Sequence, residues 1–358
     1  MFTDSDYMSR ALVLAERGRG RTSPNPMVGA VVVDPEGIVV GRGFHEQAGG
    51  PHAEVHALRD AGARARRATL YCTLEPCSHV GRTGACAPVV ADSGVARVVV
   101  ATGDPNPLVN GRGIEILRAR GISVSAGVLE GEARALNAPF FCVMTKSRPF
   151  ITMKVAMSAD HRTALRPGVR TPLTGAAAFR LIHRDRAEVD AIAVGSGTVL
   201  ADDPALTPRG AFRYRPLVRV VFDSRLRTPP DARLFSTLNA GPVIIVSTRS
   251  AATRDGQRAE LLSRSGAEIL VADGALDSTL EQLAARGVSS MIVEGGTTLH
   301  RAFWDAGLVD RVQMYMTPHR LGMGGQEWLP LPLRGLGPIT RKLLGADILI
   351  EGYVHRAD

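Results

Sequence analysis

Several kinds of residue are scarce in this chain of 358 residues: 5% are aromatic and only four are cysteine. No apolar run approaches the ~18 residues of a membrane span, and the opening MFTDSDYMSR lacks the basic and then apolar pattern of a signal peptide. These absences argue against a disulfide-stabilised scaffold and against a membrane partner. We expect a soluble, cytoplasmic protein.

Length and composition are those of an ordinary globular protein. Hydrophobic residues make up 45% and charged residues 22% of the chain, which fits neither a disordered nor a fibrous protein. At roughly 150 residues per domain, this length corresponds to about two domains, each large enough to bury a core.

The charge balance is basic, with 43 Lys and Arg against 35 Asp and Glu, a net charge of +8. Only three of the basic residues are lysine. Such a balance permits nucleic acid or a phosphorylated small molecule as partner and does not choose between them.

Hydrophobic periodicity predicts alternating helices and strands in both halves. Residues 4–17 have helical spacing, and two β-branched runs flank the turn signal DPEG at 34–37, which indicates a hairpin. Helix and strand patterns then alternate along the rest of each half, as in sheets covered by helices. We therefore expect two α/β domains, residues 1–146 and 147–358.

Histidine and cysteine are concentrated in one stretch of the first half. A catalytic zinc site needs three protein ligands, an open fourth position and a carboxylate that moves a proton. His52 with Glu54, followed by Pro76-Cys77 and Cys86, matches the His-x-Glu and Pro-Cys…Cys signature of zinc nucleobase deaminases. Eight residues separate the two cysteines, where two are usual. We expect His52, Cys77 and Cys86 to bind zinc and Glu54 to be catalytic.

Two alternatives compete for the same residues. His56 could pair with His52 at i, i+4 on one helix face, as in metalloproteases, but the adjoining glutamate of that motif is replaced by Ala53. A structural zinc would need a fourth ligand, which only His79 or Cys72 could supply. We expect Cys72 and Cys142 to be small buried side chains instead.

These segments resemble one family, the bifunctional deaminase/reductases of riboflavin biosynthesis. The resemblance is carried by PNPMVG at 24–29, GPHAEVHAL at 50–58, TLEPCSH at 73–79, GRT at 81–83, Cys86, DPNP at 104–107, ADDPALT at 201–207 and VEGGTTL at 293–299. It spans nearly the whole chain, and the long gap between the two cysteines is itself the family's pattern.

The resemblance implies two consecutive reactions. The N-terminal domain is expected to have a three-layer, cytidine-deaminase-like fold and to deaminate 2,5-diamino-6-ribosylamino-4(3H)-pyrimidinone 5′-phosphate with one zinc ion. The C-terminal domain is expected to have a dihydrofolate-reductase-like fold and to reduce the ribosyl group to ribityl with NADPH. The partner would then be this phosphorylated pyrimidine and not nucleic acid, and the resemblance also implies a homo-oligomer, a dimer or tetramer.

For the deaminase substrate, the resemblance implies a site lined by Asn25, His45, His79, Arg82, Asp104 and Asn106. Asn and Asp side chains can bind the edge of a heterocycle, and the guanidinium of Arg82 can pair with phosphate. Asp104 and Asn106 have a competing interpretation, because Asp-Pro-Asn-Pro favours tight turns whatever the function.

The second half lacks the G-x-G-x-x-G fingerprint of a Rossmann cofactor site. Two strand-to-helix junctions, GSGT at 195–198 and GGTT at 295–298, could hold the NADPH phosphates through backbone amides, and the family assigns the second to the cofactor. The resemblance implies substrate contacts from Lys154, Arg170, Arg186, Leu206, Arg209 and Glu294, with Arg186 and Arg209 as the arginines that bind the substrate phosphate. It implies cofactor contacts from Ala156, Pro172, Thr198, Asp202, Ser224, Gly295, Gly296, Thr297 and Thr298.

Three positions depart from the family's pattern: His161 replaces a glycine, Arg170 a serine and Pro172 a tryptophan. They motivate an alternative in which the deaminase is active and the C-terminal domain does not reduce. A nucleic-acid base deaminase is a further alternative, supported only by the basic charge and the shared zinc motif. It would be expected to have basic patches interleaved with aromatics, which are few here.

Overall fold

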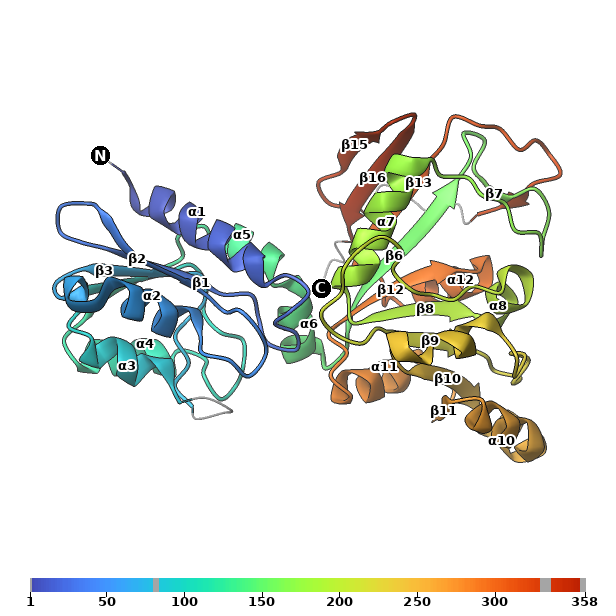
Figure 1. Cartoon of the computed structure of the whole chain (residues 1–358), viewed down its shortest axis with the longest axis horizontal. Helices are drawn as coiled ribbons and strands as arrows, with labels where there is room; N and C mark the ends of the chain where they lie inside the picture. Colours follow the sequence, from blue (N-terminus) through green and yellow to red (C-terminus); the bar gives the residue numbers. More distant parts are fainter. Residues whose placement is uncertain (1, 80–83, 329–335, 355–358) are drawn as a thin grey trace. The chain divides into compact units, whose positions relative to one another are not determined.

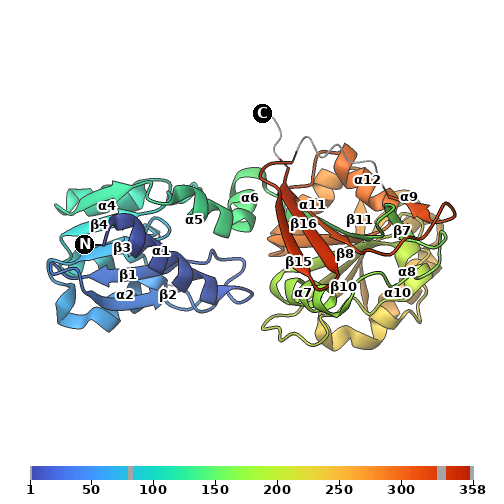
Figure 2. The same ribbon diagram turned by 90° about the horizontal axis from the view of Figure 1, so that it is seen from above.

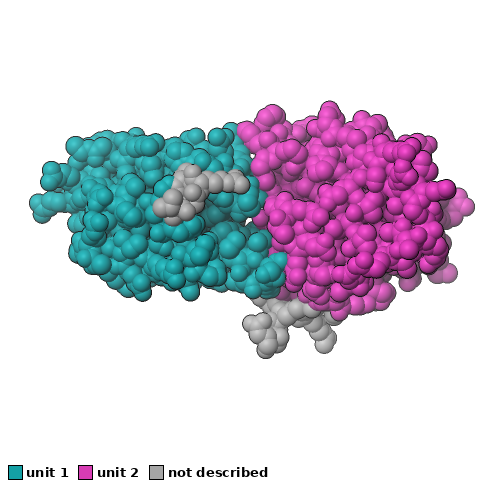
Figure 3. Space-filling model, turned by 90° about the horizontal axis from the view of Figure 1, so that it is seen from below, with its two compact units in different colours: residues 1–147 teal, residues 148–358 magenta. Residues whose placement is uncertain are grey.

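The computed structural model describes residues 2–79, 84–328 and 336–354. The chain divides into two compact units, residues 1–147 and 148–358, which Figure 3 distinguishes by colour. Within the described ranges, no helix combines the length and apolar character that crossing a membrane requires.

Unit 1 is built around a mixed sheet (Figure 1). Its strand order is β2 (Val39–Phe44), β1 (Gly29–Val33), β3 (Thr69–Cys72), β4 (Arg97–Val100) and β5 (Ser123–Ala126). β1 is antiparallel to β2 and β3, whereas β3, β4 and β5 are parallel. The predicted hairpin joins β1 to β2, and Gly37 closes its turn at φ +85°, a backbone conformation that glycine adopts without steric cost.

Helices cover both faces of this sheet. They are α1 (Asp4–Ala15), α2 (Ala53–Ala61), α3 (Cys86–Asp92), α4 (Arg112–Ala119), α5 (Glu130–Leu136) and α6 (Ala138–Lys146), with 3-10 turns η1 (Glu16–Gly18) and η2 (Gly62–Ala65). Leu70 and Cys72 belong to one buried cluster and Tyr71 to the other, as the alternation of a strand requires. α2 lies so close to β2 that a Cβ on Gly43 would stand 2.3 Å from the carbonyl oxygen of Ala53.

Unit 2 contains a larger sheet, whose described strands number nine (Figure 2). Their order is β11 (Ala267–Ala272), β10 (Val243–Thr248), β9 (Val218–Phe222), β8 (Ala191–Gly195), β12 (Ser290–Gly295), β6 (Phe150–Met157), β13 (Arg311–Met316), β16 (Asp347–Tyr353) and β15 (Thr340–Leu344). All are parallel from β11 to β13, and β16 and β15 continue the sheet antiparallel. A separate two-stranded ribbon joins β7 (Arg162–Ala164) to β14 (Gln326–Glu327).

Helices also cover both faces of the second sheet. They are α7 (Ala176–Glu188), α8 (Ser196–Asp202), α9 (Arg249–Arg254), α10 (Gly256–Arg264), α11 (Leu276–Ala285) and α12 (Thr297–Asp305), with the 3-10 segment η3 (Arg233–Ala240). α11 and α12 pack on one face through Leu280, Leu283 and Phe303. α7 packs against β13 and β16, where Tyr315 is fully buried. Both units are therefore α/β, and the carboxyl ends of the parallel strands in unit 2 meet at one edge.

The turn after β6 explains one departure from the family's pattern. His161 has φ +60°, in the left-handed region where glycine is the usual residue. Its N–H donates to the carbonyl oxygen of Ser158 (3.0 Å). Asp160 fixes the same turn, because its carboxylate accepts from the backbone N–H groups of Leu321 and Gly322. The backbone therefore keeps the conformation of a glycine although the residue is histidine.

Replacing His161 by Gly should stabilise unit 2. We expect the free energy of unfolding to rise by about 0.5–1 kcal/mol. Glycine removes the steric cost of the left-handed backbone conformation, and the greater conformational entropy that it gives the unfolded chain offsets part of this gain. Both tryptophans, Trp304 and Trp328, lie in unit 2, so tryptophan fluorescence during urea unfolding reports on this unit. His161→Ala keeps the Cβ and should gain nothing; equal gains in the two variants would contradict the strain argument.

Candidate functional site

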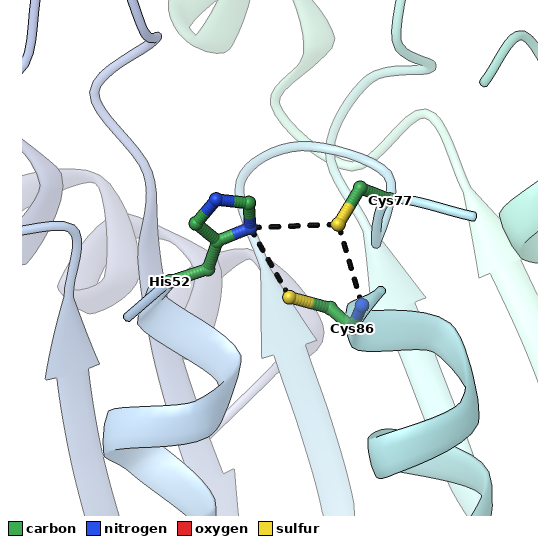
Figure 4. A group of neighbouring side chains, drawn as sticks. All are labelled: His52, Cys77 and Cys86. Atoms are coloured by element: carbon green, nitrogen blue, oxygen red, sulfur yellow. Dashed lines mark hydrogen bonds between the residues drawn. The ribbon is translucent and has the colours of Figure 1, made fainter. Parts of the chain in front are cut away.

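Three side chains of unit 1 converge on one point (Figure 4). The His52 Nδ1 atom lies 3.5 Å from the Sγ of Cys77 and 3.2 Å from the Sγ of Cys86. The backbone N–H of Cys86 also donates to the Sγ of Cys77 (3.3 Å). All three ligand atoms lie within 4.8 Å of one another. The arrangement brings one nitrogen and two sulfur donors together from separate segments.

Local structure places each of these donors. His52 is the N-cap residue of α2, and Cys86 is the first residue of α3. Cys77 follows β3 in a loop that the buried carboxylate of Glu75 anchors. That carboxylate accepts from the backbone N–H groups of Asp104 (3.3 Å), Gly111 (3.0 Å), Gly113 (2.9 Å) and Ile114 (3.2 Å). Glu75 was not predicted as a site residue, although an acid inside the motif TLEPC was a signal.

The donor set fits zinc, which binds thiolate and imidazole ligands. Glu54, in the first turn of α2 two residues after His52, is 3% exposed, and burial raises the pKa of its carboxyl to about 7. Its Oε2 atom meets no hydrogen-bond partner among the residues that the structure describes. A buried carboxylate oxygen without a partner is costly unless a ligand or water completes it. The three donors therefore lie beside a carboxylate that is free to act on what binds there.

The alternatives for the zinc ligands find no support in this geometry. In the described ranges, the group that could hold a metal contains His52 and the two cysteines, without His56, Cys72 or His79. Cys72 is fully buried in β3, and Cys142 is 6% exposed in α6. These two cysteines lie in the core, and the ligand set has three members instead of the four of a closed structural site.

Asn25 and His45 lie next to the three donors. The His45 ring meets the ring of His52 edge-on, with centroids 5.2 Å apart. Its Nδ1 lies 3.1 Å from the carbonyl oxygen of Pro51, which can only accept, so Nδ1 carries the proton. Its Nε2 therefore accepts from the amide Nδ2 of Asn25 (3.3 Å). This chain of hydrogen bonds fixes the orientation of both side chains at the rim of the site.

Asp104 and Asn106 do make turns, as their competing interpretation predicts. The Oδ1 of Asp104 accepts from the N–H of Asn106 (2.8 Å), and the Oδ1 of Asn106 accepts from the N–H of Leu108 (3.0 Å). Burial is the main cause that raises the pKa of Asp104 to about 6, with Glu75 and Cys77 acting in the same direction. The Asp104 carboxyl is therefore close enough to Cys77 for the charge of Cys77 to affect its pKa.

His79 and Arg82 are the two remaining residues expected at the deaminase substrate site. The Nδ1 atom of His79 is buried without a hydrogen-bond partner in the described part of the chain, which leaves it available to a ligand. Arg82 lies outside the described residues. Of the expected substrate side chains of unit 1, His45 contacts His52 directly and Asn25 contacts His45.

A second cluster of charged side chains lies in unit 2. Lys154 on β6 and Glu294 on β12 lie on adjacent strands, with Nζ and Oε2 4.0 Å apart. Arg186 on α7 donates from Nε to Oε1 (2.7 Å) and from Nη2 to Oε2 (2.5 Å) of Glu294. Burial would raise the pKa of Glu294, but the charges of Arg186 and Lys154 outweigh it and lower the pKa to about 2. For the ammonium of Lys154, burial acts in the other direction and lowers the pKa.

The loop after α8 is tied to α7 beside this cluster. The Nη1 of Arg186 donates to the carbonyl oxygen of Thr207 (3.3 Å), and the backbone N–H of Arg209 donates to the Nδ1 of His183 (2.8 Å). The Arg209 guanidinium lies over the ring of Phe179, 5.0 Å from its centroid. His183 was not predicted as a site residue, because its partner Arg209 lies 26 residues further along the chain.

Other expected substrate and cofactor residues lie around the same loop. Leu206 is buried with φ +52°. Burial raises the pKa of Asp202, and the positive charge of Arg170 acts in the opposite direction. Arg170 and Pro172 are both exposed. Arg170 therefore adds a solvent-accessible positive charge near Arg209. Burial is the main cause that lowers the pKa of Arg209, and the charges of Arg186 and Arg170 act in the same direction.

The two candidate cofactor junctions lie side by side. β8 leads into α8 and β12 leads into α12, and these strands are neighbours in the sheet. A Cβ on Gly295 would stand 2.8 Å from the Oγ1 of Thr198, so a larger residue would require the Thr198 side chain to move. Gly296 has φ +84° and precedes the first residue of α12. The two junctions therefore lie next to each other at the carboxyl edge of the sheet.

The remaining expected cofactor residues lie on the surrounding elements. Ala156 is on β6, Ser224 is exposed after β9, and Thr298 is exposed in the first turn of α12. The Oγ1 of Thr297 accepts from the side-chain amide of Gln326 (3.2 Å).

Comparisons with known proteins identify the class. Residues 1–102 match the family model of the cytidine and deoxycytidylate deaminase zinc-binding region, and residues 149–333 match the model of the RibD C-terminal domain. A zinc-binding deaminase domain is thus followed by a reductase domain in one chain.

Matches over the full length identify the family. The chain is 42% identical over 322 residues to the riboflavin biosynthesis protein RibD of Aquifex aeolicus, covering 90% of this chain and 88% of that one. It is 41% identical over 343 residues to RibD of Escherichia coli strain K12, covering 92% and 91%. The solved structure of Acinetobacter baumannii RibD, form 1, superposes with a TM-score of 0.86 at 35% identity over 99% of both chains. The chain belongs to the RibD family.

A solved Thermotoga maritima relative is described as a diaminohydroxyphosphoribosylaminopyrimidine deaminase/5-amino-6-(5-phosphoribosylamino)uracil reductase. It superposes with a TM-score of 0.84 at 33% identity over 98% of this chain and 99% of that one. Together these findings confirm the expected fold class, a cytidine-deaminase-like domain followed by a dihydrofolate-reductase-like one. They also confirm that the chain is an enzyme of riboflavin biosynthesis, with zinc and NADPH as cofactors.

Zinc content tests the ligand set. Purified protein should contain about one zinc ion per chain, and Cys77→Ser or Cys86→Ser should lose nearly all of it, because a serine hydroxyl does not replace a thiolate ligand. Atomic emission on the purified variants measures this. Cys142→Ser changes a cysteine of the core in the same unit and should keep its zinc. Full zinc in either of the first two variants would show that the ligands are wrong.

Removing the charge of Glu294 should destabilise unit 2. In Glu294→Gln the buried Arg186 and Lys154 would share a site without a counter-charge, at a cost of about 3 kcal/mol. The measurement is urea unfolding followed by tryptophan fluorescence. Glu260→Gln is the matched control, because its ion pair with Arg264 is largely exposed and should be worth less than about 0.5 kcal/mol. Equal effects in the two variants would contradict a buried ion cluster.

Proposed function

We propose that unit 1 deaminates 2,5-diamino-6-ribosylamino-4(3H)-pyrimidinone 5′-phosphate and that unit 2 then reduces the ribosyl group of the product to ribityl. The observation that carries the proposal is the convergence of His52, Cys77 and Cys86 beside the unpartnered carboxylate oxygen of Glu54. The Thermotoga maritima relative is described by the same two activities.

In the deaminase site, each residue has a task that its geometry allows. His52, Cys77 and Cys86 would hold zinc, which supplies a Lewis acid that makes water nucleophilic near neutral pH. Glu54 is placed to take a proton from the attacking water and to deliver it to the ring nitrogen and the departing amine. His45 and Asn25 are already fixed by their own hydrogen bond, so they can orient the ring with little loss of entropy. Deamination releases ammonia.

In the reductase site, the charged cluster is suited to binding and proton transfer. NADPH supplies the hydride when it is bound, and the surface of the two glycine junctions can hold its phosphates through backbone N–H groups. The ammonium of Lys154, held beside Glu294, can donate the proton that the reduced ribosyl oxygen requires. Arg186 already uses its guanidinium on Glu294 and Thr207. Arg209 and the exposed Arg170 are therefore better placed for the substrate phosphate.

This placement gives one departure from the family's pattern, Arg170, a function. An arginine at position 170 adds a phosphate-binding charge where the family has serine. The intact Lys154–Glu294–Arg186 cluster argues against a C-terminal domain that has lost its reaction. The substrate partner is a phosphorylated pyrimidine small molecule, and a role on nucleic acid has no support. A homo-oligomer, dimer or tetramer, and a cytoplasmic location stay predictions from the sequence.

The substitution Glu54→Gln should separate the two reactions. We expect the deamination rate to fall by roughly 10²–10⁴-fold, the usual worth of a positioned proton-transfer group, while zinc stays bound. NADPH oxidation with the deaminated substrate should be unchanged, because the reductase residues lie in the other unit. Product formation and absorbance of NADPH measure the two steps, and Glu46→Gln, an exposed acid of unit 1, is the control.

Each outcome bears on a different part of the proposal. Unchanged deamination in Glu54→Gln would show that this residue is not the proton carrier. Wild-type protein that deaminates but does not oxidise NADPH with the deaminated substrate would support the alternative of a non-reducing C-terminal domain. Deamination of an RNA or DNA oligonucleotide would revive the nucleic-acid alternative.

A further inference from the structure

A buried histidine links the cofactor junction to a distant segment of unit 2. His300, in the second turn of α12, is 2% exposed. Its Nε2 lies 3.1 Å from the carbonyl oxygen of Val293 on β12, and its Nδ1 lies 3.0 Å from the indole Nε1 of Trp328. The imidazole and indole rings meet edge-on, with an interplanar angle of 88°. The histidine therefore has both ring nitrogens engaged.

The chemistry of the two hydrogen-bond partners determines which ring nitrogen of His300 carries the proton and which accepts. The indole N–H can only donate, so the Nδ1 of His300 accepts. The proton of the neutral ring is then on Nε2, which donates to the carbonyl oxygen of Val293. Burial lowers the pKa of His300 to about 4, so the ring stays neutral. The hydrogen bonds run in one direction, from Trp328 through His300 to Val293.

The carbonyl at the end of this chain belongs to an irregular part of β12. The pairing of β12 with β8 passes from Val293 opposite Ala193 to Gly295 opposite Val194, so Glu294 is an extra residue in the strand. Such a bulge re-aims the side chain that it carries. Here it carries Glu294, which contacts Lys154 and Arg186. The same bulge leads directly into the two glycines that precede α12.

A second contact joins the same two segments. The side-chain amide of Gln326 donates to the Oγ1 of Thr297, the first residue of α12 (3.2 Å). Gln326 belongs to β14, which pairs with β7, and Trp328 follows that ribbon directly. The residues around β14 are therefore fastened to the first two turns of α12 at two places.

We propose that Trp328 is a positioning residue of the reductase site, which holds His300 against Val293 and so fixes the bulge that presents Glu294 and the glycine junction. The proposal rests on the reductase function of unit 2. It assigns a role to a tryptophan that does not contact the charged cluster itself. It also gives the ribbon formed by β7 and β14 a link to cofactor binding.

The first test needs neither substrate nor cofactor. The chain has two tryptophans, so a ¹⁵N–¹H spectrum of the tryptophan-labelled protein should show two indole N–H signals, assigned with the variants Trp328→Phe and Trp304→Phe. In cofactor-free protein we expect slow deuterium exchange of the Trp328 indole. His300→Leu removes the acceptor, and exchange should accelerate at least about tenfold. An unchanged exchange rate in His300→Leu would overturn the hydrogen-bond chain.

The second test measures the reductase step with deaminated substrate. In Trp328→Phe, which keeps the aromatic ring but not the N–H, the KM for NADPH should rise about fivefold, the factor for one lost neutral hydrogen bond. Deamination should be unchanged. Trp304→Phe is the matched control, because Trp304 is also a partly buried tryptophan that packs against the same core, and its KM should stay at the wild-type value.

A double-mutant cycle separates positioning from general loss of stability. If Trp328 acts through His300, the variant combining Trp328→Phe and His300→Leu should raise the KM for NADPH no more than His300→Leu alone. Additive effects, or a KM in Trp328→Phe within twofold of wild type, would overturn the proposal. Failure of the proposed function looks different, since wild-type protein would then fail to oxidise NADPH at all.

Discussion

A charge buried away from water must be matched by partners, and this constraint organises both sites. In unit 1 the carboxylate of Glu75 is matched by four backbone N–H groups, and the loop that carries Cys77 is held in place as a result. In unit 2 the carboxylate of Glu294 is matched by Arg186 and Lys154. Glu54 is the exception, since one of its oxygens has no partner in the described ranges. The unmatched carboxylate is the one expected to move protons.

How far the site could be predicted from the sequence depended on how many residues separate the interacting side chains along the chain. His52, Glu54, Cys77 and Cys86 lie within 35 residues, and their chemistry is specific enough to predict a metal site before any fold is known. The ion pair of Arg186 with Glu294 joins residues 108 positions apart, and no local pattern predicts it. The resemblance named both residues without their contact. The roles of Glu75 and Trp328 were missed for the same reason, because each depends on partners that only the fold brings near.

The fold was predictable where burial leaves a clear pattern. Strands β1, β6, β8 and β10 are buried on both faces or nearly so, and their runs of apolar, mostly β-branched residues indicated them. The hairpin of β15 and β16 was not predicted, because four of the five residues of β15 are exposed and its sequence, TRKLL, has no period of two that distinguishes it from a loop. Edge strands with solvated faces carry little sequence signal.

The basic charge acquires a different meaning once the arginines are located. Arg219 is fully buried and donates to the carbonyl oxygens of Leu234 and Gly241 and to the Oγ1 of Thr237. Arg213 donates from one nitrogen to three carbonyl oxygens at the end of α7. A guanidinium has five donors, so one arginine can satisfy several backbone acceptors that would otherwise lack partners. Part of the net charge of +8 therefore acts inside unit 2, and the charge is poor grounds for a nucleic-acid surface.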